Sequence, residues 1–514
     1  MPWTTCFSLK RLTHVFERGG DKDHVDARAA ETNTSHRVVN EMSEKSLGGE
    51  SKIKFYPLYH LAPPRGWMND PNGFSSYNNY YHLFYQYNPF SSHNQGIVHW
   101  GHARSKDFFH WEDLGIAMSP DKTYDKDGVY SGSAVVENNN MYLFYTGNID
   151  VSANPNHVQC QALAISANGI SFTKNENNPI IKSSFDVPDI RDPKVWKHNG
   201  TYFMVLGNSF NNNTLGRVLL HASDDKINWK NVGVLAESNG DLGYMWECPD
   251  FFELNGLFVL LFSPQGVKPQ GDKYRNLYQT GYLVGKFDYI TYKFTIAYKF
   301  REIDNGHDFY ATQTMMNKKN ERIMVAWFDM WEMNYPEQDQ GFNGHMTIPR
   351  ILTLSPSGLI IQKPVKEIKN ARGILIHTGK TNGNTAIKLN NNAAEITVIA
   401  TATKDFVLYL ETLKQEKHVT LTFDTSNATV TLDRGGNDGV RRTTWKPYGS
   451  SLKWTIYVDS SSVELFCGEG EVTFSSRFFP EGQVSVRVGE DCQADLLKIY
   501  NMKQTLYTKY FRCS

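Results

Sequence analysis

Three carboxylates of this chain stand in short motifs whose residue types could do acid–base chemistry. They are Asp70 in WMNDPNG, Asp192 in IRDPKVW and Glu247 in WECPDFF. Two carboxyl groups that flank a glycosidic bond are the usual apparatus of glycoside hydrolysis, one as nucleophile or base and the other as general acid. Crowding suits this chemistry, because a neighbouring negative charge raises the pKa of one group and keeps it protonated near neutral pH.

Each carboxylate also has a plainer interpretation. WMNDPNG is typical of a tight turn, since Pro71 fixes φ and Gly73 tolerates a positive φ. A cation site is a further alternative, because hard metal ions take carboxylate oxygens and His99 and His102 in HWGH could add nitrogen ligands. An H-x-x-H pair on a strand places its members on opposite faces, which favours a structural role for both histidines. We therefore expect no metal and no cofactor.

The elements that must position these residues are marked by five apolar runs, each of which follows a short Asn-rich turn. The runs are NNYYHLFYQYN from Asn78, NNNMYLFYTGN from Asn138, HNGTYFMVLGNS from His198, LNGLFVLLFSPQG from Leu254 and KNERIMVAWFD from Lys319. An Asn-Gly or Asn-Asn turn before a β-branched and aromatic run predicts a β-hairpin. Their spacing of about 60 residues indicates five copies of one unit.

A second motif keeps the same step along the chain. Ser105-x-Asp107-x-x-x-Trp111 recurs as Ser166-x-Asn168-x-x-x-Phe172 and as Ser223-x-Asp225-x-x-x-Trp229. A repeat of this length, made of short strands, predicts the blades of a β-propeller, and five blades fit residues 51–365. Chance alignment of unrelated hairpins is the alternative, which two motifs in phase disfavour.

The repeat predicts where the carboxylates lie. About 14 residues before the centre of each apolar run stand, in chain order, Asp70, Ser131 in YSGSAV, Asp192, Glu247 and the segment 309–313. Equivalent ends of the innermost strands of a propeller meet around its central channel. We therefore expect three blades to bring their carboxylates into one axial pocket.

The motifs together carry a family resemblance. WMNDPNG, FYQYNP, HWGHARSKDFFHW, YSGSA, IRDPKVW, WECPD and FYATQ occur in the order seen in glycoside hydrolase family 32, and the chain resembles this family from about Phe55 to its C-terminus. The family includes invertases (β-fructofuranosidases), sucrose-6-phosphate hydrolases, inulinases and levanases. The resemblance implies a retaining glycoside hydrolase that releases terminal β-D-fructofuranosyl units, with sucrose as the leading substrate.

The same resemblance implies roles by position. Asp70 would be the nucleophile that attacks the anomeric carbon, Glu247 the general acid and then base, and Asp192 a stabiliser of the transition state through the fructose hydroxyls. Cys248 would be a small buried neighbour of the acid. The positions that match residues holding the fructose ring are Asn69, Gln86, Ser131 and Arg191.

One segment departs from the family pattern. The family usually has a tryptophan about eight residues after the glutamine of FYQYNP, where it lines the apolar face of the fructose pocket. Here the segment reads QYNPFSSHNQGIVHW, with His93 and Asn94 at the expected place and about one extra residue before Trp100. We expect a less apolar pocket wall, unless another aromatic side chain such as Phe90 fills the space.

The pattern of apolar and polar residues changes after the propeller repeat. Residues 366–514 alternate apolar and polar side chains between turn signals, which predicts an antiparallel β-sandwich. Structural support for the propeller is the favoured role of this domain, and a carbohydrate-binding module is the alternative. Residues 1–50 are polar, charged and aperiodic, which predicts a disordered extension. The fold class expected is therefore all-β, a five-bladed β-propeller followed by an antiparallel β-sandwich.

Composition limits the partners. The 514 residues are too many for one ordinary core, and a net charge of −1 gives no reason to expect a nucleic acid. No apolar run is long enough to span a bilayer, and the six cysteines are too scattered for a zinc site or a dense disulfide framework. We expect a small-molecule sugar partner, no nucleic acid and no membrane. Lys10 and Arg11 stand where the apolar part of a secretory signal would be, so we expect no such signal and leave the compartment open.

Other functions compete with sucrose hydrolysis. A sucrose-6-phosphate hydrolase, a fructan hydrolase or a fructosyltransferase would use the same residues. A sialidase-like propeller would need an arginine triad and a tyrosine nucleophile, which we cannot place in phase with the repeat. An inactive sugar-binding propeller would be expected to lack Asp70 or Glu247, and both are present.

Overall fold

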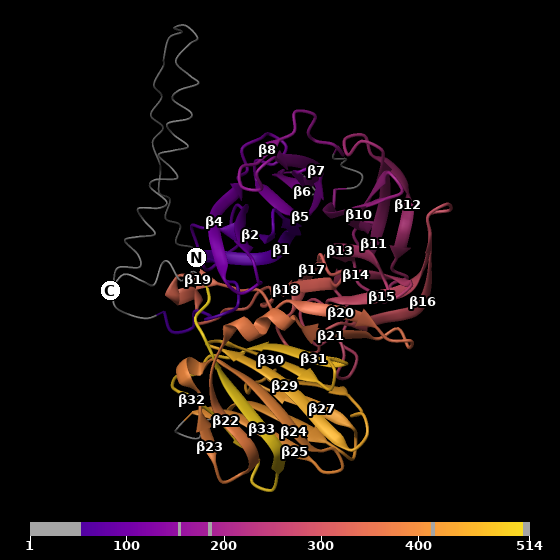
Figure 1. The fold of residues 1–514 in the computed structure, drawn as a ribbon. Coiled ribbons are helices and arrows are strands. Elements are labelled where there is room, and N and C mark those ends of the chain that lie inside the picture. Colours follow the sequence, from indigo (N-terminus) through magenta and orange to yellow (C-terminus); the bar gives the residue numbers. More distant parts are fainter. Residues whose placement is uncertain (1–52, 153–155, 183–187, 413–416, 507–514) are drawn as a thin grey trace, which may run out of the picture. The chain divides into compact units, whose positions relative to one another are not determined.

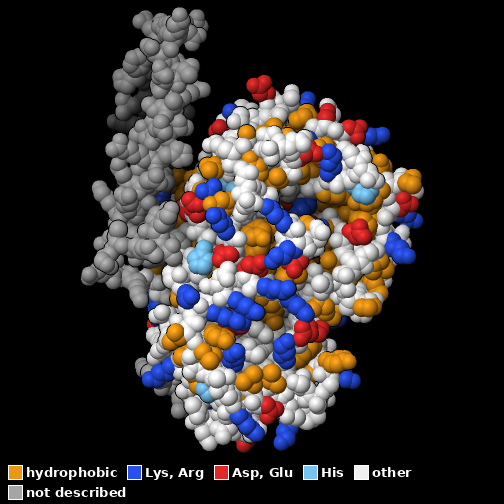
Figure 2. All heavy atoms as spheres, viewed as in Figure 1, with side chains coloured by type: hydrophobic (Ala, Val, Ile, Leu, Met, Phe, Trp, Pro, Cys, Tyr) orange, Lys and Arg blue, Asp and Glu red, His pale blue; other side chains and the backbone are white. Residues whose placement is uncertain are grey.

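The fold was determined from a computed structural model, which describes residues 53–152, 156–182, 188–412 and 417–506 (Figure 1). The described residues from Phe55 onward form one compact unit. The extension expected at residues 1–50 lies outside the described residues. Acidic and basic side chains are interspersed over the face shown in Figure 2. No helix among the described residues is long and apolar enough to cross a membrane.

Five sheets follow one another along the first part of the chain, each built from consecutive antiparallel strands in chain order, and the first sheet also contains one later strand. The first contains β1 (Gly66–Tyr77), β2 (Tyr80–Asn88), β3 (His99–Ser105), β4 (Trp111–Met118) and the late strand β19 (Phe342–Asn343); the second β5 (Gly128–Glu137), β6 (Asn140–Asp150), β7 (His157–Ser166) and β8 (Thr173–Lys174). The third contains β9 (Ile190–His198), β10 (Thr201–Phe210), β11 (Leu215–Ser223) and β12 (Lys230–Glu237); the fourth β13 (Met245–Leu254), β14 (Leu257–Gln265), β15 (Gly281–Asp288) and β16 (Lys293–Glu302). The fifth contains β17 (Tyr310–Met316), β18 (Arg322–Trp327), β20 (Arg350–Leu354) and β21 (Ile360–Pro364).

The hairpins form where the Asn-rich turns predict them. Asn78 and Asn79 both have positive φ between β1 and β2, as do Asn138 and Asn139 between β5 and β6. Asn tolerates this left-handed backbone better than most residues, and two consecutive positive φ values match the twist of a tight hairpin. The hairpins predicted at these turns are therefore confirmed.

The five sheets close into a ring. The first strands β1, β5, β9, β13 and β17 contact one another in order, and β17 returns to β1. The late strand β19 pairs in parallel with the start of β1, at Gly66–Phe342 and Trp67–Asn343, so that the last sheet is tied to the first. Closure protects edges that would otherwise be exposed. The five-bladed β-propeller is thus confirmed.

Apolar side chains fill each space between neighbouring blades. One buried cluster joins Phe84 and Leu143 of blades one and two, and another joins Val259 and Met324 of blades four and five. A typical buried aromatic side chain removes 150–250 Å² from water, which is why the aromatic-rich runs stabilise the interfaces between blades. The cluster between blades five and one contains Trp67, Tyr310 and Trp327 and lies at the channel end discussed below.

Two six-stranded antiparallel sheets follow the propeller and enclose one continuous apolar core, which confirms the β-sandwich. The first is ordered β22 (Arg372–Asn382), β33 (Gln493–Met502), β24 (Ala394–Thr401), β29 (Ser451–Asp459), β30 (Ser462–Cys467) and β31 (Val472–Arg477). The second is ordered β23 (Ala386–Lys388), β32 (Val484–Val488), β25 (Phe406–Thr412), β26 (Lys417–Asp424), β27 (Thr429–Asp433) and β28 (Val440–Thr444). The described helices are the short 3-10 turns η1 (Gln338–Gln340), η2 (Lys366–Ala371) and η3 (Asn390–Asn392).

Buried ion pairs join the propeller to the sandwich. Arg350 of β20 bonds Asp304 through Nη1 at 2.9 Å and Glu464 of β30 through Nη2 at 2.5 Å. The ring of His60 lies between Asp459 Oδ2, 2.8 Å from Nδ1, and Glu464 Oε1, 2.9 Å from Nε2. Burial alone would lower the pKa of His60, but these two carboxylates raise it to about 8.

Replacing His60 with asparagine should weaken the pH dependence of stability. A folded-state pKa of about 8, above the ordinary 6.5, means that the charged imidazole stabilises the fold fully below pH 6.5 and that this contribution is lost as pH rises through 8. The contribution is on the order of 2 kcal/mol. Thermal unfolding of wild type and His60→Asn at pH 6 and pH 9 measures it. The Tm gap between the two proteins should shrink at pH 9, and a constant gap would contradict the role of His60.

Candidate active site

A β-bulge interrupts the innermost strand of every blade at the same repeat position. In four innermost strands the register shifts between Met68 and Pro71, Tyr130 and Gly132, Glu247 and Asp250, and Tyr310 and Gln313. In β9 the shift lies between Arg191, which pairs with Gly207, and Lys194, which pairs with Val205. A bulge leaves residues unpaired and re-aims their side chains. The bulges contain Asp70, Ser131 and Asp192 and directly follow Glu247, so the ring of strands directs these side chains to one end of the channel.

The turn predicted for WMNDPNG is wrong. These residues lie inside β1, which runs without a chain reversal from Gly66 to Tyr77. Pro71 is accommodated because it stands at the bulge, where a missing N–H removes no regular ladder bond. Gly73 does adopt a positive φ of 54°, but at a second irregularity of the strand and not in a turn. The proline and glycine signals therefore mark bulges here.

Asp70 is held by donors from three blades. Its Oδ2 accepts hydrogen bonds from Ser131 Oγ at 2.7 Å and from the thiol of Cys248 at 3.3 Å, and its Oδ1 accepts one from Asn69 Nδ2 at 3.1 Å. Burial and the negative charge of Glu247 raise the pKa of Asp70 despite these donors. The carboxylate is thus fixed in orientation and 8% exposed.

Asp192 occupies a strained position in the bulge of β9. Its φ is 64°, a left-handed value that costs free energy in a residue other than glycine and that clusters at functional sites. Its Oδ2 accepts the backbone N–H of Cys248 at 2.9 Å, and Cys248 itself has a φ of 49°. Burial, followed by the charge of Glu247, raises the pKa of Asp192 to about 7. Burial and the charge of Glu247 therefore act in the same direction on the pKa values of Asp70 and Asp192.

Both carboxyl oxygens of Glu247 accept hydrogen bonds from neighbouring side chains. Arg191 donates to its Oε1 from Nε at 2.9 Å and from Nη2 at 2.7 Å. Tyr310 donates its hydroxyl to Oε2 at 2.6 Å, and Gln265 donates Nε2 to the same oxygen at 2.8 Å. Four hydrogen bonds donated from three elements hold this carboxyl group in one orientation.

The structure brings the predicted site residues into one cluster. The amide of Gln86 contacts Ser131 Oγ at 3.0 Å, and Ser131 bonds Asp70. Burial of Asp192 beside the charges of Asp70 and Glu247 shows that the three carboxylates share one electrostatic environment. The members of the cluster are Asn69, Asp70, Gln86, Ser131, Arg191, Asp192 and Glu247.

Sequence reasoning missed two donors to Glu247. The repeat places Tyr310 in its fifth segment but assigns it no role, and no motif of the sequence marks Gln265. Gln265 stands at the end of β14, opposite Met245 in the register of β13. The phase of the repeat would not have found it, because Gln86 stands opposite the bulge of β1, whereas Gln265 lies beyond the bulge of β13.

The segment that lacks the family tryptophan makes contacts at the protein surface. Asn94 bonds Ser91 Oγ at 3.2 Å and His93 contacts the exposed Asp339. Phe90 is 75% exposed and its ring lies edge-on to that of His99 with centroids 6.1 Å apart, and its place in the pocket wall stays a prediction. A different ring, Trp331, stacks on Trp67 with centroids 6.2 Å apart and packs on the cluster beside the site.

The histidines considered as metal ligands lie elsewhere. His102 Nε2 contacts His82 Nδ1 at 2.9 Å, and its ring stacks on Phe84 with centroids 3.9 Å apart. His99 contacts the carbonyl of Ile97 at 3.1 Å. Within the described part of the chain, no group of three or more His, Cys, Asp or Glu side chains is arranged to hold a metal ion.

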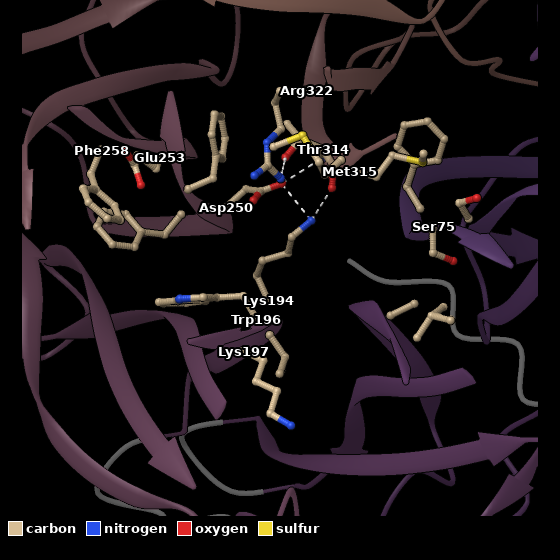
Figure 3. Close-up of a pocket in the computed structure, with 18 of the residues that line it drawn as sticks. Ser75, Lys194, Trp196, Lys197, Asp250, Glu253, Phe258, Thr314, Met315 and Arg322 are labelled. Atoms are coloured by element: carbon tan, nitrogen blue, oxygen red, sulfur yellow. Dashed lines mark hydrogen bonds and ion pairs between the residues drawn. The ribbon is translucent and has the colours of Figure 1, made fainter. Parts of the chain in front are cut away.

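A cavity of about 400 Å³ lies at the other end of the innermost strands (Figure 3). There Lys194 points its ammonium at Asp250 Oδ2, 2.9 Å away, and at the carbonyl of Thr314, 2.5 Å away, with Arg322 beside them. The buried carboxylate of Asp250 is therefore neutralised by a lysine. This end of the channel has no crowded pair of carboxylates and is not the candidate active site.

Asp192→Asn should stabilise the protein at alkaline pH. Ionising Asp192 costs more in the folded state, where its pKa is about 7, than in the unfolded chain, where it is near 3.8. The folded state holds more protons between these values, so the free energy of unfolding falls as pH rises from 3.8 to 7, and the loss is complete above 7. The neutral amide avoids this cost, a gain on the order of a few kcal/mol. Thermal unfolding should show a higher Tm for the variant at pH 8 and a smaller difference at pH 4; no gain at pH 8 would contradict the account.

Comparisons with known proteins agree with this geometry. The model of the glycosyl hydrolases family 32 N-terminal domain matches residues 60–364, and the model of the family 32 C-terminal domain matches residues 365–499. A sucrose-6-phosphate hydrolase of Escherichia coli is 39% identical over 435 residues, covering 83% of this chain and 90% of the relative. A raffinose invertase of Escherichia coli is 37% identical, with the same coverage of both chains.

Solved structures extend the likeness to the whole fold. A family 32 β-fructofuranosidase of Bombyx mori superimposes with a TM-score of 0.86 at 39% identity, covering 92% of this chain and 99% of its own. A sucrose-6-phosphate hydrolase of Lactobacillus gasseri gives 0.82 at 28% identity, covering 91% and 97%. The fold is that of a glycoside hydrolase. The chain belongs to glycosyl hydrolase family 32.

Proposed function

We propose that this glycoside hydrolase releases β-D-fructofuranosyl units from sucrose with retention of configuration. The observation that carries the proposal is the pairing of two differently held carboxyl groups at one end of the channel. Asp70 accepts three hydrogen bonds and lies next to Ser131, while Glu247 is fixed by Arg191 and Tyr310. A nucleophile and a separate acid are the two parts that double displacement requires.

The first step forms a covalent intermediate. A carboxylate oxygen of Asp70 attacks the anomeric carbon of the fructosyl unit, and the bond from that carbon to the bridging oxygen breaks. Glu247 gives its proton to the bridging oxygen, so that glucose leaves as a neutral alcohol. The hydrogen bonds from Ser131 and Cys248 hold Asp70 in place for the attack, which lowers the entropic part of the barrier.

The second step returns the enzyme to its starting state. The ionised Glu247 takes a proton from water, the water oxygen attacks the anomeric carbon, and the bond to Asp70 breaks with its electron pair returning to the carboxylate. The two inversions retain the configuration. Arg191 and Tyr310 support Glu247 in both of its protonation states, because each can remain hydrogen bonded to the carboxyl group.

Asp192 is proposed to stabilise the positive charge that develops on the sugar. Its negative charge lies beside the reacting groups, and hydrogen bonds to fructose hydroxyls would strengthen as that charge grows. Asn69, Gln86, Ser131 and Arg191 supply amide, hydroxyl and guanidinium groups around the same point. A ring with several hydroxyls needs such paired donors and acceptors.

Sucrose 6-phosphate is the second candidate substrate, because relatives at 37–39% identity carry the name sucrose-6-phosphate hydrolase. For the Bombyx mori β-fructofuranosidase, a mutant was solved in complex with sucrose, which favours the unphosphorylated sugar at equal identity. Release of fructose from sucrose, sucrose 6-phosphate, raffinose and inulin should be compared through kcat/KM. Preference for sucrose supports the proposal, a preference for the phosphorylated sugar replaces it with the second candidate, and no fructose release refutes it.

A further inference from the structure

The loop 266–280 between β14 and β15 forms part of the wall beside Glu247. Tyr278 is half-buried, packs on the aromatic cluster at this end of the channel, and lies with its ring centroid 5.9 Å from that of Tyr310, the donor to Glu247. Its backbone pairs with that of Gln265, the other donor to Glu247. Burial, Tyr244 and the charge of Glu247 all raise the pKa of Tyr278, in agreement with their closeness.

The same loop is fastened to the sandwich at its middle. Arg441, at the start of β28, donates Nε to Asn276 Oδ1 at 2.9 Å and Nη2 to the carbonyl of Arg275 at 3.3 Å. The guanidinium is itself fixed by Asp438, which accepts from Nη1 at 2.9 Å and from Nη2 at 2.8 Å. The Arg441 side chain is 6% exposed, so its bonds to Asn276 and to the carbonyl of Arg275 start from a buried guanidinium, whereas the Asp438 side chain is 56% exposed and its ion pair counts for less.

The fastening point is close to Tyr278 along the chain. Asn276 donates Nδ2 to the carbonyl of Gly306, and its own carbonyl accepts Gln279 Nε2 at 2.7 Å. Gln279 is buried and its N–H bonds the carbonyl of Pro264 at 3.2 Å, next to Gln265. Tyr278 is therefore held between two fixed neighbours, one tied to the sandwich and the other tied to the strand that supports Glu247.

We propose that Arg441 of the sandwich is a positioning residue for the leaving group, because it holds the loop that places Tyr278 beside the acid Glu247. Tyr278 lies beside Tyr310, which donates its hydroxyl to Glu247, so we assign the Tyr278 ring to the wall of the pocket for the departing sugar. The sandwich thereby takes part in substrate recognition without touching the substrate. This inference rests on the proposed function of Glu247 as the general acid.

Two substrates separate leaving-group binding from the chemistry. Sucrose has a sugar as its leaving group, while methyl β-D-fructofuranoside has a methanol too small to reach Tyr278. Arg441→Ala should raise KM for sucrose about threefold to tenfold with kcat changed by less than about twofold, since the lost contacts bind the ground and transition states alike. The kinetics of the methyl fructoside should stay within about twofold of wild type. Asn276→Ala, which cuts the same link from the loop side, should reproduce the result if Arg441→Ala folds poorly.

A double-mutant cycle tests the route through Tyr278. Tyr278→Ala should give the same selective rise in KM, and the double variant with Arg441→Ala should be no worse than the more impaired single variant, because both remove one interaction. Arg487→Ala is the matched control, since Arg487 forms a similar double hydrogen bond to Glu411 within the sandwich.

Three results would overturn the proposal. They are an unchanged KM for sucrose in both Arg441→Ala and Asn276→Ala, equal losses on both substrates, and additive effects of Arg441→Ala and Tyr278→Ala. If wild type hydrolyses neither substrate, the proposed function fails first and this inference fails with it.

Discussion

Asp70→Asn should lower kcat for sucrose by at least about 10⁴-fold, because an amide cannot serve as the nucleophile of a double displacement. The substitution keeps the shape of the side chain, and the amide oxygen can still accept the hydroxyl of Ser131. KM should change far less than kcat, since the pocket for the fructose ring is kept. Fructose release under saturating sucrose measures the effect, and removal of a buried charge should leave the Tm equal to wild type or higher.

The matched control for this variant is Asp125→Asn. Asp125 is also fully buried and bonded, to Tyr145 and Lys174, but it contacts no residue of the candidate site. Its replacement should lower the Tm and leave kcat of the folded protein close to wild type. A kcat for Asp70→Asn within about tenfold of wild type would remove Asp70 from the role of nucleophile.

Glu247→Gln should lower kcat/KM for sucrose by about 10²–10⁴-fold, the usual contribution of a general acid. The loss should be much smaller for an aryl β-fructofuranoside, whose phenolate leaves without help from a proton donor. Arg191 can still donate to the amide oxygen, so the position of the side chain is kept. Comparison of the two substrates measures how much of the loss belongs to protonation of the leaving group.

Glu253→Gln provides the control from the same strand. Glu253 is an exposed residue of β13, beyond the bulge that follows Glu247, and its change should affect neither substrate. Equal losses on sucrose and on the aryl fructoside in Glu247→Gln would contradict the assignment of Glu247 as the acid.

The positions of the site residues followed from the repeat. Side chains at one phase of five similar hairpins must meet at one end of a closed ring, so Asp70, Asp192 and Glu247 could be placed together without knowledge of any contact. The hairpin turns could also be predicted from the sequence. Asn78 and Asn138 each begin a pair of asparagines, and asparagine tolerates the positive φ that a tight hairpin turn requires. Such backbone preferences depend on a few neighbouring residues, so the folded protein keeps them.

The bulges could not be predicted in the same way. Pro71 and Gly73 indicate a departure from regular strand geometry, but a turn and a bulge use the same residues, and the choice depends on the strand pairs formed with β2. The positive φ of Asp192 is likewise fixed by its surroundings, including the N–H of Cys248 that bonds its carboxylate. Such strain is maintained by contacts distant in sequence.

Long-range contacts set the remaining features. The donors Tyr310 and Gln265 reach Glu247 from other strands, and the link from Arg441 to Asn276 joins residues in different domains. The spacing of apolar residues does not predict such pairs, because each partner is a polar residue that nothing in its own strand or loop marks as unusual. The position of a residue within the repeat predicts which part of the propeller its side chain lies in. Its hydrogen-bond partner is known only from the structure.

The stereochemistry of the first product tests the central claim most directly. Sucrose labelled with ¹³C at the anomeric carbon of its fructosyl unit should be hydrolysed by the wild-type protein while NMR spectra are recorded before the released sugar mutarotates. Double displacement through Asp70 predicts that β-fructofuranose is formed first and that the other forms follow. Release of α-fructofuranose as the first product would show a single inversion and would contradict the roles given to Asp70 and Glu247.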